Sequence, residues 1–200
     1  MKLLTISGSL RTGSFNTQLL THAEDLARDA GHQVHRFDRV SEIPPFNEDH
    51  EQRPVGVVED LRAEVRHSDA VLIATPEYSG SIPGQLKNLL DWAARPDGAC
   101  VFTDLPVAVI SASPGKFGAA WAREATEHIL TQMGATVLST GWGLPLVHER
   151  AAGNTGLIDD DAENQLRTII GRLAEALNGP GGQDAEPSAA RHRTAAVAGA

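Results

Sequence analysis

The sequence predicts an α/β fold in three layers (α/β/α), with a five-stranded parallel sheet between two layers of helices. Short apolar runs alternate with amphipathic helical patterns along the chain, as in a doubly wound parallel sheet. The chain has 200 residues, enough for one such domain with a sizeable core. Because crossover connections are right-handed, few layouts remain, and for this length we expect the strand order 2-1-3-4-5.

The chain opens with a strand, a polar loop and a helix. Residues 3–6 are mostly apolar and short enough for a buried strand. A helix is expected from Ser14, a suitable N-cap, to Gly31, a suitable stop. Its apolar positions recur at helical spacing, at Phe15, Leu19, Ala23, Leu26 and Ala30. The polar strand that follows at 33–37 suits the edge of the sheet.

The middle of the chain contains the strongest strand signal. Residues 41–56 include three prolines and predict a long loop. Val58, Leu61 and Val65 then mark a short amphipathic helix. Residues 70–75 are apolar at almost every position, which is typical of a central parallel strand covered on both faces.

A loop rich in proline and glycine follows this strand and leads into another helix. The apolar positions of that helix are Ile82, Leu86, Leu89, Leu90 and Ala93. Residues 106–110 predict a fourth buried strand, followed by a polar loop at 111–118. The next helix ends at Gly134 and steps through Phe117, Trp121, Ala125, Ile129 and Met133.

The remaining elements are a fifth strand, a loop and a last helix. The strand is expected at 135–139, and a glycine-rich loop runs from it through Gly156. Three aspartates suit the N-terminus of the last helix, whose buried positions are Leu166, Ile169, Ile170, Leu173 and Leu177. We therefore expect one domain over 1–178. Residues 179–200 lack periodicity and predict a disordered tail.

Composition excludes several classes of protein. A net charge of -9 disfavours nonspecific nucleic-acid binding, which needs a basic face. No apolar run is long enough to cross a bilayer, and the apolar start is too short for a secretory signal. The one cysteine, Cys100, excludes an internal disulfide framework and is expected to pack as a small apolar residue. We therefore expect a cytoplasmic protein that binds neither nucleic acid nor membrane.

The loop at 7–16 is suited to holding a phosphate. A strand that leads through a polar, glycine-containing loop into a helix presents free backbone amides and the positive end of a helix dipole. Arg11 adds a permanent cation, and neutral donors are supplied by Ser7, Ser9, Ser14 and Asn16. The alternative, a serine-rich turn that only caps the helix, stays open for this loop taken alone.

Two common phosphate loops are excluded at this position. Gly8 and Gly13 have the spacing of an ATP-binding P-loop, but Ser14 and Phe15 follow instead of lysine and serine or threonine. The dinucleotide fingerprint is absent because position 10 is leucine. The loop therefore favours a terminal phosphomonoester that is bound without phosphoryl transfer.

Three loops should meet at one edge of the predicted sheet. In the expected order, loops 7–16, 75–81 and 111–118 converge at the switch point between the first and third strands. All three are rich in glycine, serine or proline, which lets backbone amides approach a planar ligand. Tyr78 offers an aromatic face, and Phe117 or Trp121 can add apolar wall. A phosphate at the first loop and a flat ring over the others describe flavin mononucleotide (FMN).

Two motifs resemble those of a known family. They are Gly8-Ser9-Leu10-Arg11 with Ser14 and Asn16, and Pro76-Glu77-Tyr78 followed by the segment 83–92. Together they resemble the NADPH-dependent FMN reductase family over residues 2–178. That family has a flavodoxin-like fold and includes quinone, chromate and azo-dye reductases. The segment 83–92 is also what any buried amphipathic helix would show, so its diagnostic value comes from the resemblance.

The resemblance implies a set of cofactor-binding residues. The first loop would hold the FMN phosphate and the second would contact the isoalloxazine, partly through backbone groups. The expected set is Ser9, Arg11, Ser14, Phe15, Asn16, Pro76, Glu77, Tyr78, Ser79, Gly80, Ser113 and Gly115. Two departures from the family pattern are Ser79 in place of asparagine and Ala119 in place of a second glycine after Gly118. No catalytic side chain and no metal ligand are expected.

The resulting hypothesis is an FMN-dependent oxidoreductase that uses NADPH or NADH. It would pass hydride through FMN to a small acceptor such as a quinone, free flavin, azo compound or chromate. The resemblance implies a homodimer or homotetramer. The main alternative is a flavodoxin-like electron carrier that serves a protein partner. A serine hydrolase ranks lower because the chain has no G-x-S-x-G motif. His32 and His35 lack an acidic or cysteine partner at metal-binding spacing.

Overall fold

The computed structural model describes residues 1–53, 55–152 and 157–177 and confirms the predicted fold class. Five parallel strands form one sheet in the order β2-β1-β3-β4-β5. Their bounds are β1 Lys2–Ser7, β2 Gln33–Phe37, β3 Ala70–Thr75, β4 Pro106–Ser111 and β5 Thr136–Val137. The polar strand β2 lies at the edge, and the apolar β3 lies at the centre, as the sequence predicts.

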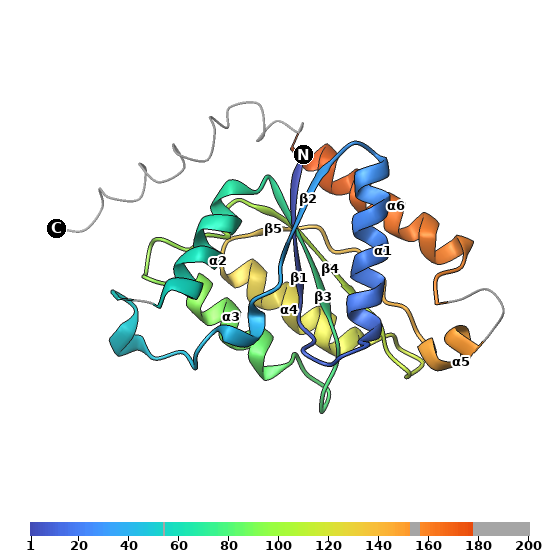
Figure 1. The fold of residues 1–200 in the computed structure, drawn as a ribbon, viewed down its shortest axis with the longest axis horizontal. Helices are drawn as coiled ribbons and strands as arrows, with labels where there is room; N and C mark the ends of the chain where they lie inside the picture. The colour runs from blue at the N-terminus through green and yellow to red at the C-terminus, as the bar shows by residue number, and fades with distance from the viewer. Residues whose placement is uncertain (54, 153–156, 178–200) are drawn as a thin grey trace.

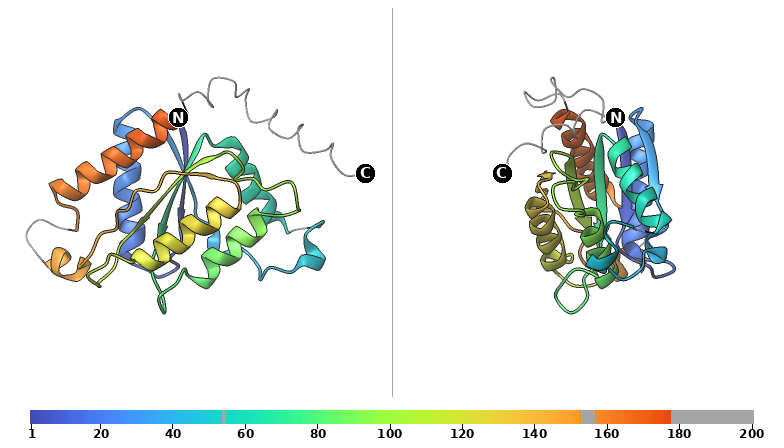
Figure 2. Two further views of the ribbon diagram at one scale, coloured as in Figure 1. Left: turned by 180° about the vertical axis from the view of Figure 1, so that it is seen from behind. Right: turned by 90° about the vertical axis from the view of Figure 1, so that its left-hand side faces the viewer.

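Helices cover both faces of this sheet. Figure 1 shows α1 and α6 on one face and α2, α3 and α4 on the other, and Figure 2 shows the same layers from two further directions. The bounds are α1 Phe15–Asp29, α2 Gly56–His67, α3 Gly84–Ala93, α4 Ala120–Gln132, α5 Val147–Ala152 and α6 Asp160–Ala176, with 3₁₀ turns at Val40–Glu42 and Glu48–His50.

The hydrophobic core has two halves because alternate residues of a strand point to opposite faces. In β3, Val71 and Ile73 pack toward α2, α3 and α4. Their neighbours Leu72 and Ala74 pack toward α1 and α6. Burial on both sides explains why β3 and β4 are continuous apolar runs.

The capping residues predicted for two helices lie at the helix ends that the structure shows. Ser14 is the N-cap of α1, and its hydroxyl accepts a hydrogen bond from the Thr17 amide at 3.4 Å. Gly31 follows the helix with a φ of 82°, a conformation that glycine adopts without strain. Asp159 is the N-cap of α6, and its carboxylate accepts from the Ala162 amide at 3.0 Å.

The predicted apolar stripe of α4 is not its buried face. The side chains of Phe117 and Trp121 are 76% and 62% exposed, respectively. The helix instead buries the neighbouring stripe, Ala122, Arg123, Thr126, Glu127 and Leu130. Two charged residues can lie on this face because the Arg123 guanidinium bonds the Glu127 carboxylate, which also accepts from the Ser139 hydroxyl. Sequence periodicity identified the helix but not its orientation.

Four smaller expectations need correction. Ile82 lies before α3 and not within it. Residues 41–56 are not all loop, because they contain the two 3₁₀ turns and the first residue of α2. The fifth strand is two residues long, and the predicted glycine-rich loop contains α5. The predicted tail at 179–200 lies outside the described residues.

Within the described ranges, none of the helices combines the length and apolar character that a membrane span requires.

Candidate functional site

A cavity of about 320 Å³ opens where the carboxyl ends of β1, β3 and β4 meet. These ends lie at the lower side of the sheet in Figure 1. β1 and β3 are neighbours although the chain visits β2 between them, so the cavity lies at the topological switch point. It is lined by Ser9, Arg11, Ser14, Phe15, Asn16, Pro76, Glu77, Tyr78, Ala112, Ser113, Pro114 and His148.

The first wall of the cavity is the loop between β1 and α1. Gly8 donates its amide hydrogen to the Ala74 carbonyl at 2.8 Å, which fixes this loop to the end of β3. A Cβ at Gly8 would lie 2.8 Å from Leu86 Cδ2 and 3.3 Å from the Ala74 carbonyl oxygen, so a larger residue would require the buried Leu86 side chain to shift. The first amides of α1 have no partner within the helix. The loop therefore directs amides and the positive end of the α1 dipole at the cavity.

Arg11 supplies a fixed positive charge beside these amides. Its guanidinium lies 5.6 Å from the centre of the Phe15 ring and donates to the Thr12 carbonyl at 3.3 Å. Among the described residues it has no carboxylate partner, although most arginines of this acidic chain do. Its charge is therefore available to an anionic ligand.

Ser9 has a buried hydroxyl oxygen without a hydrogen-bond partner among the described residues. The residue is 8% exposed and lines the cavity. Buried polar atoms are almost always paired, because an unpaired one loses its bond to water without replacement. A ligand oxygen in the cavity would satisfy this hydroxyl.

Asn16 joins the first loop to the third. Its side-chain Nδ2 donates to the Ala112 carbonyl at 2.9 Å, and its Oδ1 accepts from the Ala112 amide at 2.8 Å. Only one amide hydrogen remains for another partner. The expected phosphate contact from this side chain is thus limited, and its main role in the structure is to hold two walls together.

The second wall is a two-residue hairpin. Tyr78 and Ser81 exchange backbone hydrogen bonds of 3.1 and 3.0 Å. Ser79 and Gly80 form the tip with φ values of 53° and 71°, as such a tight turn requires. The Tyr78 side chain is 54% exposed beside the cavity. Ser79 and Gly80 themselves do not line the cavity.

Glu77 lies in the same hairpin, but its carboxylate turns away to α4. Its Oε2 accepts from the Ala122 amide at 3.2 Å. The N-cap position of α4 is Ala119, which has a φ of 60° and no side-chain acceptor. Glu77 therefore caps α4 from a distant loop. This bond orients the carboxylate toward α4.

The third wall is the loop after β4. The Ser113 hydroxyl accepts from the Gly115 amide at 3.0 Å, and Gly115 is exposed outside the cavity lining. A Cβ at Gly118 would lie 2.6 Å from the Gly143 carbonyl oxygen, so the two backbones touch. This contact sets the route of the chain after β5. Neither Phe117 nor Trp121 lines the cavity.

The structure thus gathers nine of the twelve expected residues around one cavity. The three outside it are Ser79, Gly80 and Gly115. The sequence reading missed Ala112, Pro114 and His148. No local signal marks His148, because it lies outside the three predicted loops and comes from α5, within the segment that the sequence predicts to be a loop.

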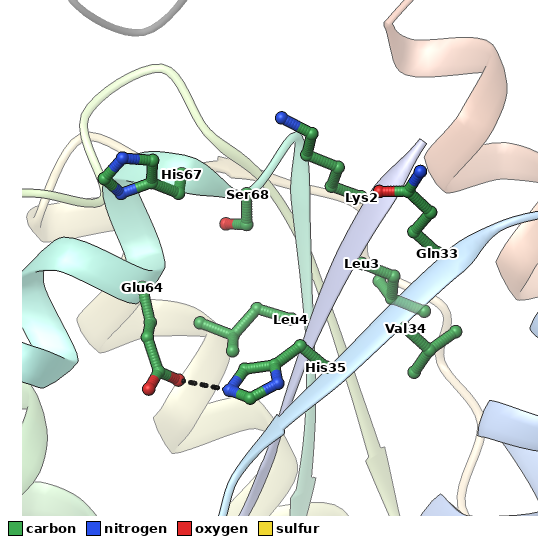
Figure 3. A pocket seen from close by; sticks show the side chains of 9 residues that line it. All are labelled: Lys2, Leu3, Leu4, Gln33, Val34, His35, Glu64, His67 and Ser68. Atoms are coloured by element: carbon green, nitrogen blue, oxygen red, sulfur yellow. Dashed lines mark ion pairs between the residues drawn. The ribbon is translucent and has the colours of Figure 1, made fainter.

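Two other cavities differ in chemistry from this one. Figure 3 shows a cavity of about 320 Å³ at the amino-terminal edge of the sheet, where the His35 imidazole pairs with Glu64 at 3.0 Å. A groove of about 490 Å³ between α3 and α4 includes Cys100, whose thiol pKa is raised by burial. Neither is lined by a phosphate loop. Within the described ranges, no group of three or more His, Cys, Asp or Glu side chains is arranged to hold a metal.

Comparisons with known proteins give a consistent result. A family model described as NADPH-dependent FMN reductase matches residues 1–149. A Pseudomonas aeruginosa protein named NAD(P)H-dependent FMN reductase is 44% identical over 126 residues, which cover 62% of this chain and 65% of that protein. A quinone reductase of Pseudomonas putida is 37% identical over 84% of this chain and 90% of its own length.

A solved structure is also similar over most of the chain. It is the flavoenzyme NAD(P)H:(acceptor) oxidoreductase of Paracoccus denitrificans, at a TM-score of 0.78 and 31% identity. The superposition covers 88% of this chain and 97% of that one.

Proposed function

The chain belongs to the NADPH-dependent FMN reductase family, and from that premise we propose that it is an FMN-dependent NAD(P)H oxidoreductase. It passes hydride from NAD(P)H through bound FMN to a small acceptor such as a quinone. The observation that carries this proposal is the cavity at the switch point, where the phosphate loop faces an exposed tyrosine across a shared space. The relatives named for FMN and quinone reduction support the same reaction.

The residues around the cavity fit FMN at its phosphate end. The amides of the α1 N-terminus, the unpaired hydroxyl of Ser9 and the free charge of Arg11 all suit a phosphomonoester. The carboxylate of Glu77, which would repel a phosphate, is bonded to α4 instead. The donor set is therefore that of an anion site in a chain of net charge -9.

The protein acts by position and electrostatics. When bound, FMN supplies the capacity to accept a hydride and to give electrons up again. Arg11 and Ser9 hold the phosphate, while the Tyr78 hairpin and the loop at Ser113 border the space for the ring. Asn16 keeps the first and third loops in register. No side chain acts as an acid or base in this scheme.

Absorbance and turnover test the proposal. The purified protein, or the protein titrated with FMN, should show a flavin absorbance band that shifts on binding. It should then oxidise NADPH steadily when a quinone is added without any protein partner. Failure to bind FMN in excess would refute the proposal. Binding without turnover would favour the alternative, an electron carrier.

We also propose that the chain forms a homodimer or homotetramer through the outer face of α4. Trp121 is exposed on this face, and its ring centre lies 6.4 Å from that of the exposed Phe117 in the loop before the helix. Ile129 and Met133 continue the stripe into the groove beside α3. Exposed aromatic side chains of this kind are typical of a protein interface. Light scattering should give a dimer or larger mass, and Trp121→Glu should reduce it to that of a monomer.

The expected setting is the cytoplasm, where NAD(P)H is available and a chain with one cysteine needs no oxidising environment. The same turnover assay, run once with NADPH and once with NADH, measures which of the two the protein prefers.

A further inference from the structure

His148 belongs to α5 and lines the cavity. Both sequence motifs, in the first and the second loop, lie outside α5. Its imidazole packs edge-on against the Phe15 ring, with ring centres 5.1 Å apart and planes at 84°. Phe15 is the first residue of α1, directly after the Ser14 cap. His148 therefore lies at the phosphate end of the cavity.

Phe15 separates two basic side chains. Arg11 lies over the ring at 5.6 Å, and the His148 ring forms a T-shaped contact with it. The Phe15 ring thus holds both groups beside the first turn of α1. Apart from this ring contact, the His148 imidazole has neither a hydrogen bond nor an ion pair with a described residue.

The charged groups around His148 leave it free to meet an anion. Its neighbour Arg150 is paired with Asp159 at the start of α6. Glu149 is exposed and does not line the cavity, and neither does Lys116 of the third loop. Among the described residues of the lining, Glu77 carries a carboxylate, and its Oε2 accepts from the Ala122 amide. It forms no ion pair with the His148 imidazole.

We propose that His148 is a second basic ligand of the flavin phosphate, which it binds as the imidazolium ion together with Arg11. This rests on the proposed function. An imidazolium donates from both ring nitrogens, and its hydrogen bonds to an oxyanion are charge-assisted. The imidazolium should therefore strengthen the preference for FMN over riboflavin, which lacks only the phosphate, and a neutral imidazole should contribute less.

The test compares the dissociation constants of FMN and riboflavin by flavin fluorescence at pH 6 and pH 8.5. For flavin-free full-length protein, His148→Gln should reduce the FMN preference about tenfold at pH 6 and much less at pH 8.5. His148→Arg should restore the preference at both pH values, because arginine stays charged throughout this range. His67→Gln is the matched control, an exposed histidine at the opposite edge of the sheet (Figure 3). It should leave both constants unchanged.

Each other outcome has a distinct meaning. Equal weakening of FMN and riboflavin by His148→Gln would show a packing role and overturn the inference. An unchanged preference at pH 6 in both His148 variants would do the same. Failure of the unaltered protein to bind either flavin would refute the proposed function itself, and this inference with it.

Discussion

Asn16 and Ala112, 96 positions apart in the chain, exchange two hydrogen bonds between the side-chain amide of one and the backbone of the other. The pair is buried and joins the first turn of α1 to the end of β4. It fixes the distance between two walls of the candidate site. The geometry on which flavin binding depends is therefore tied to the stability of the fold.

Breaking this pair should lower both stability and flavin affinity. Asn16→Ala leaves a buried amide and carbonyl of Ala112 unpaired, at a cost of about 2 to 4 kcal/mol in the free energy of unfolding. Urea unfolding measures this loss. The matched control is Asn164→Ala on the exposed face of α6, which should change stability by less than about 0.5 kcal/mol. Equal unfolding midpoints for the two variants would contradict the structural role.

Arg11→Ala should weaken FMN binding and leave riboflavin binding unchanged. The free guanidinium is expected to form charge-assisted bonds to the phosphate, so its loss should raise the FMN dissociation constant by roughly 10- to 100-fold. Arg11→Lys should recover part of the loss, because lysine keeps the charge but not the fork. Lys116→Ala, an exposed cation outside the cavity, is the control. An unchanged constant in Arg11→Ala would remove Arg11 from the site.

Glu77 should behave as a helix cap and not as an acid or base. Glu77→Ala removes the acceptor for the Ala122 amide and should cost about 1 kcal/mol in stability. Glu77→Gln keeps an acceptor and should cost less. With NADPH and a quinone, the turnover number of Glu77→Gln should stay within a factor of about two. A large loss of turnover in a fully folded Glu77→Gln would instead reveal proton transfer by this side chain.

Glu24 is the buried anchor between α1 and the edge strand β2. Its carboxylate accepts from the Thr5 hydroxyl and from Arg36 Nε at 2.7 Å, and it lies 3.5 Å from Arg28. Glu24→Ala leaves these groups unpaired and should cost about 3 to 5 kcal/mol, read from urea unfolding. Asp25→Ala removes the exposed partner of Arg28 and should lower the free energy of unfolding by less than about 1 kcal/mol. Similar losses in the free energy of unfolding for the two variants would refute the anchoring role of Glu24.

Stability should fall in acid partly because of Asp159. The hydrogen bond from the Ala162 amide, assisted by Arg150, lowers the pKa of this carboxyl below its ordinary value of 3.8. A lowered pKa means that the folded state favours the charged form. The contribution is thus complete above pH 3.8 and is lost as the pH falls through the lowered value. Asp159→Asn should reduce the change in the free energy of unfolding between pH 2 and 5, measured by urea unfolding at each pH. Asp160→Asn, exposed at the next position, should leave this pH dependence unchanged.

The strand pattern and the loops of the site were predictable because both are recorded locally in the sequence. Parallel strands covered on two faces must be apolar throughout, and helix ends need particular residues such as Ser14 and Gly31. The handedness of the crossovers left few strand orders, and the length of the chain favoured the one observed. Since loops at the carboxyl ends of β1, β3 and β4 then share one edge, the sequence also located the candidate site.

Tertiary packing alone decided the rest. The face of α4 that packs on the sheet contains Arg123 and Glu127, with Glu127 accepting from Ser139, and this orientation leaves Trp121 exposed. Glu77 and His148 acquired their positions from elements distant in sequence. The types and spacing of residues indicate how much of a segment is buried. They do not indicate which distant group that segment contacts. That choice is made when the helices pack on the sheet.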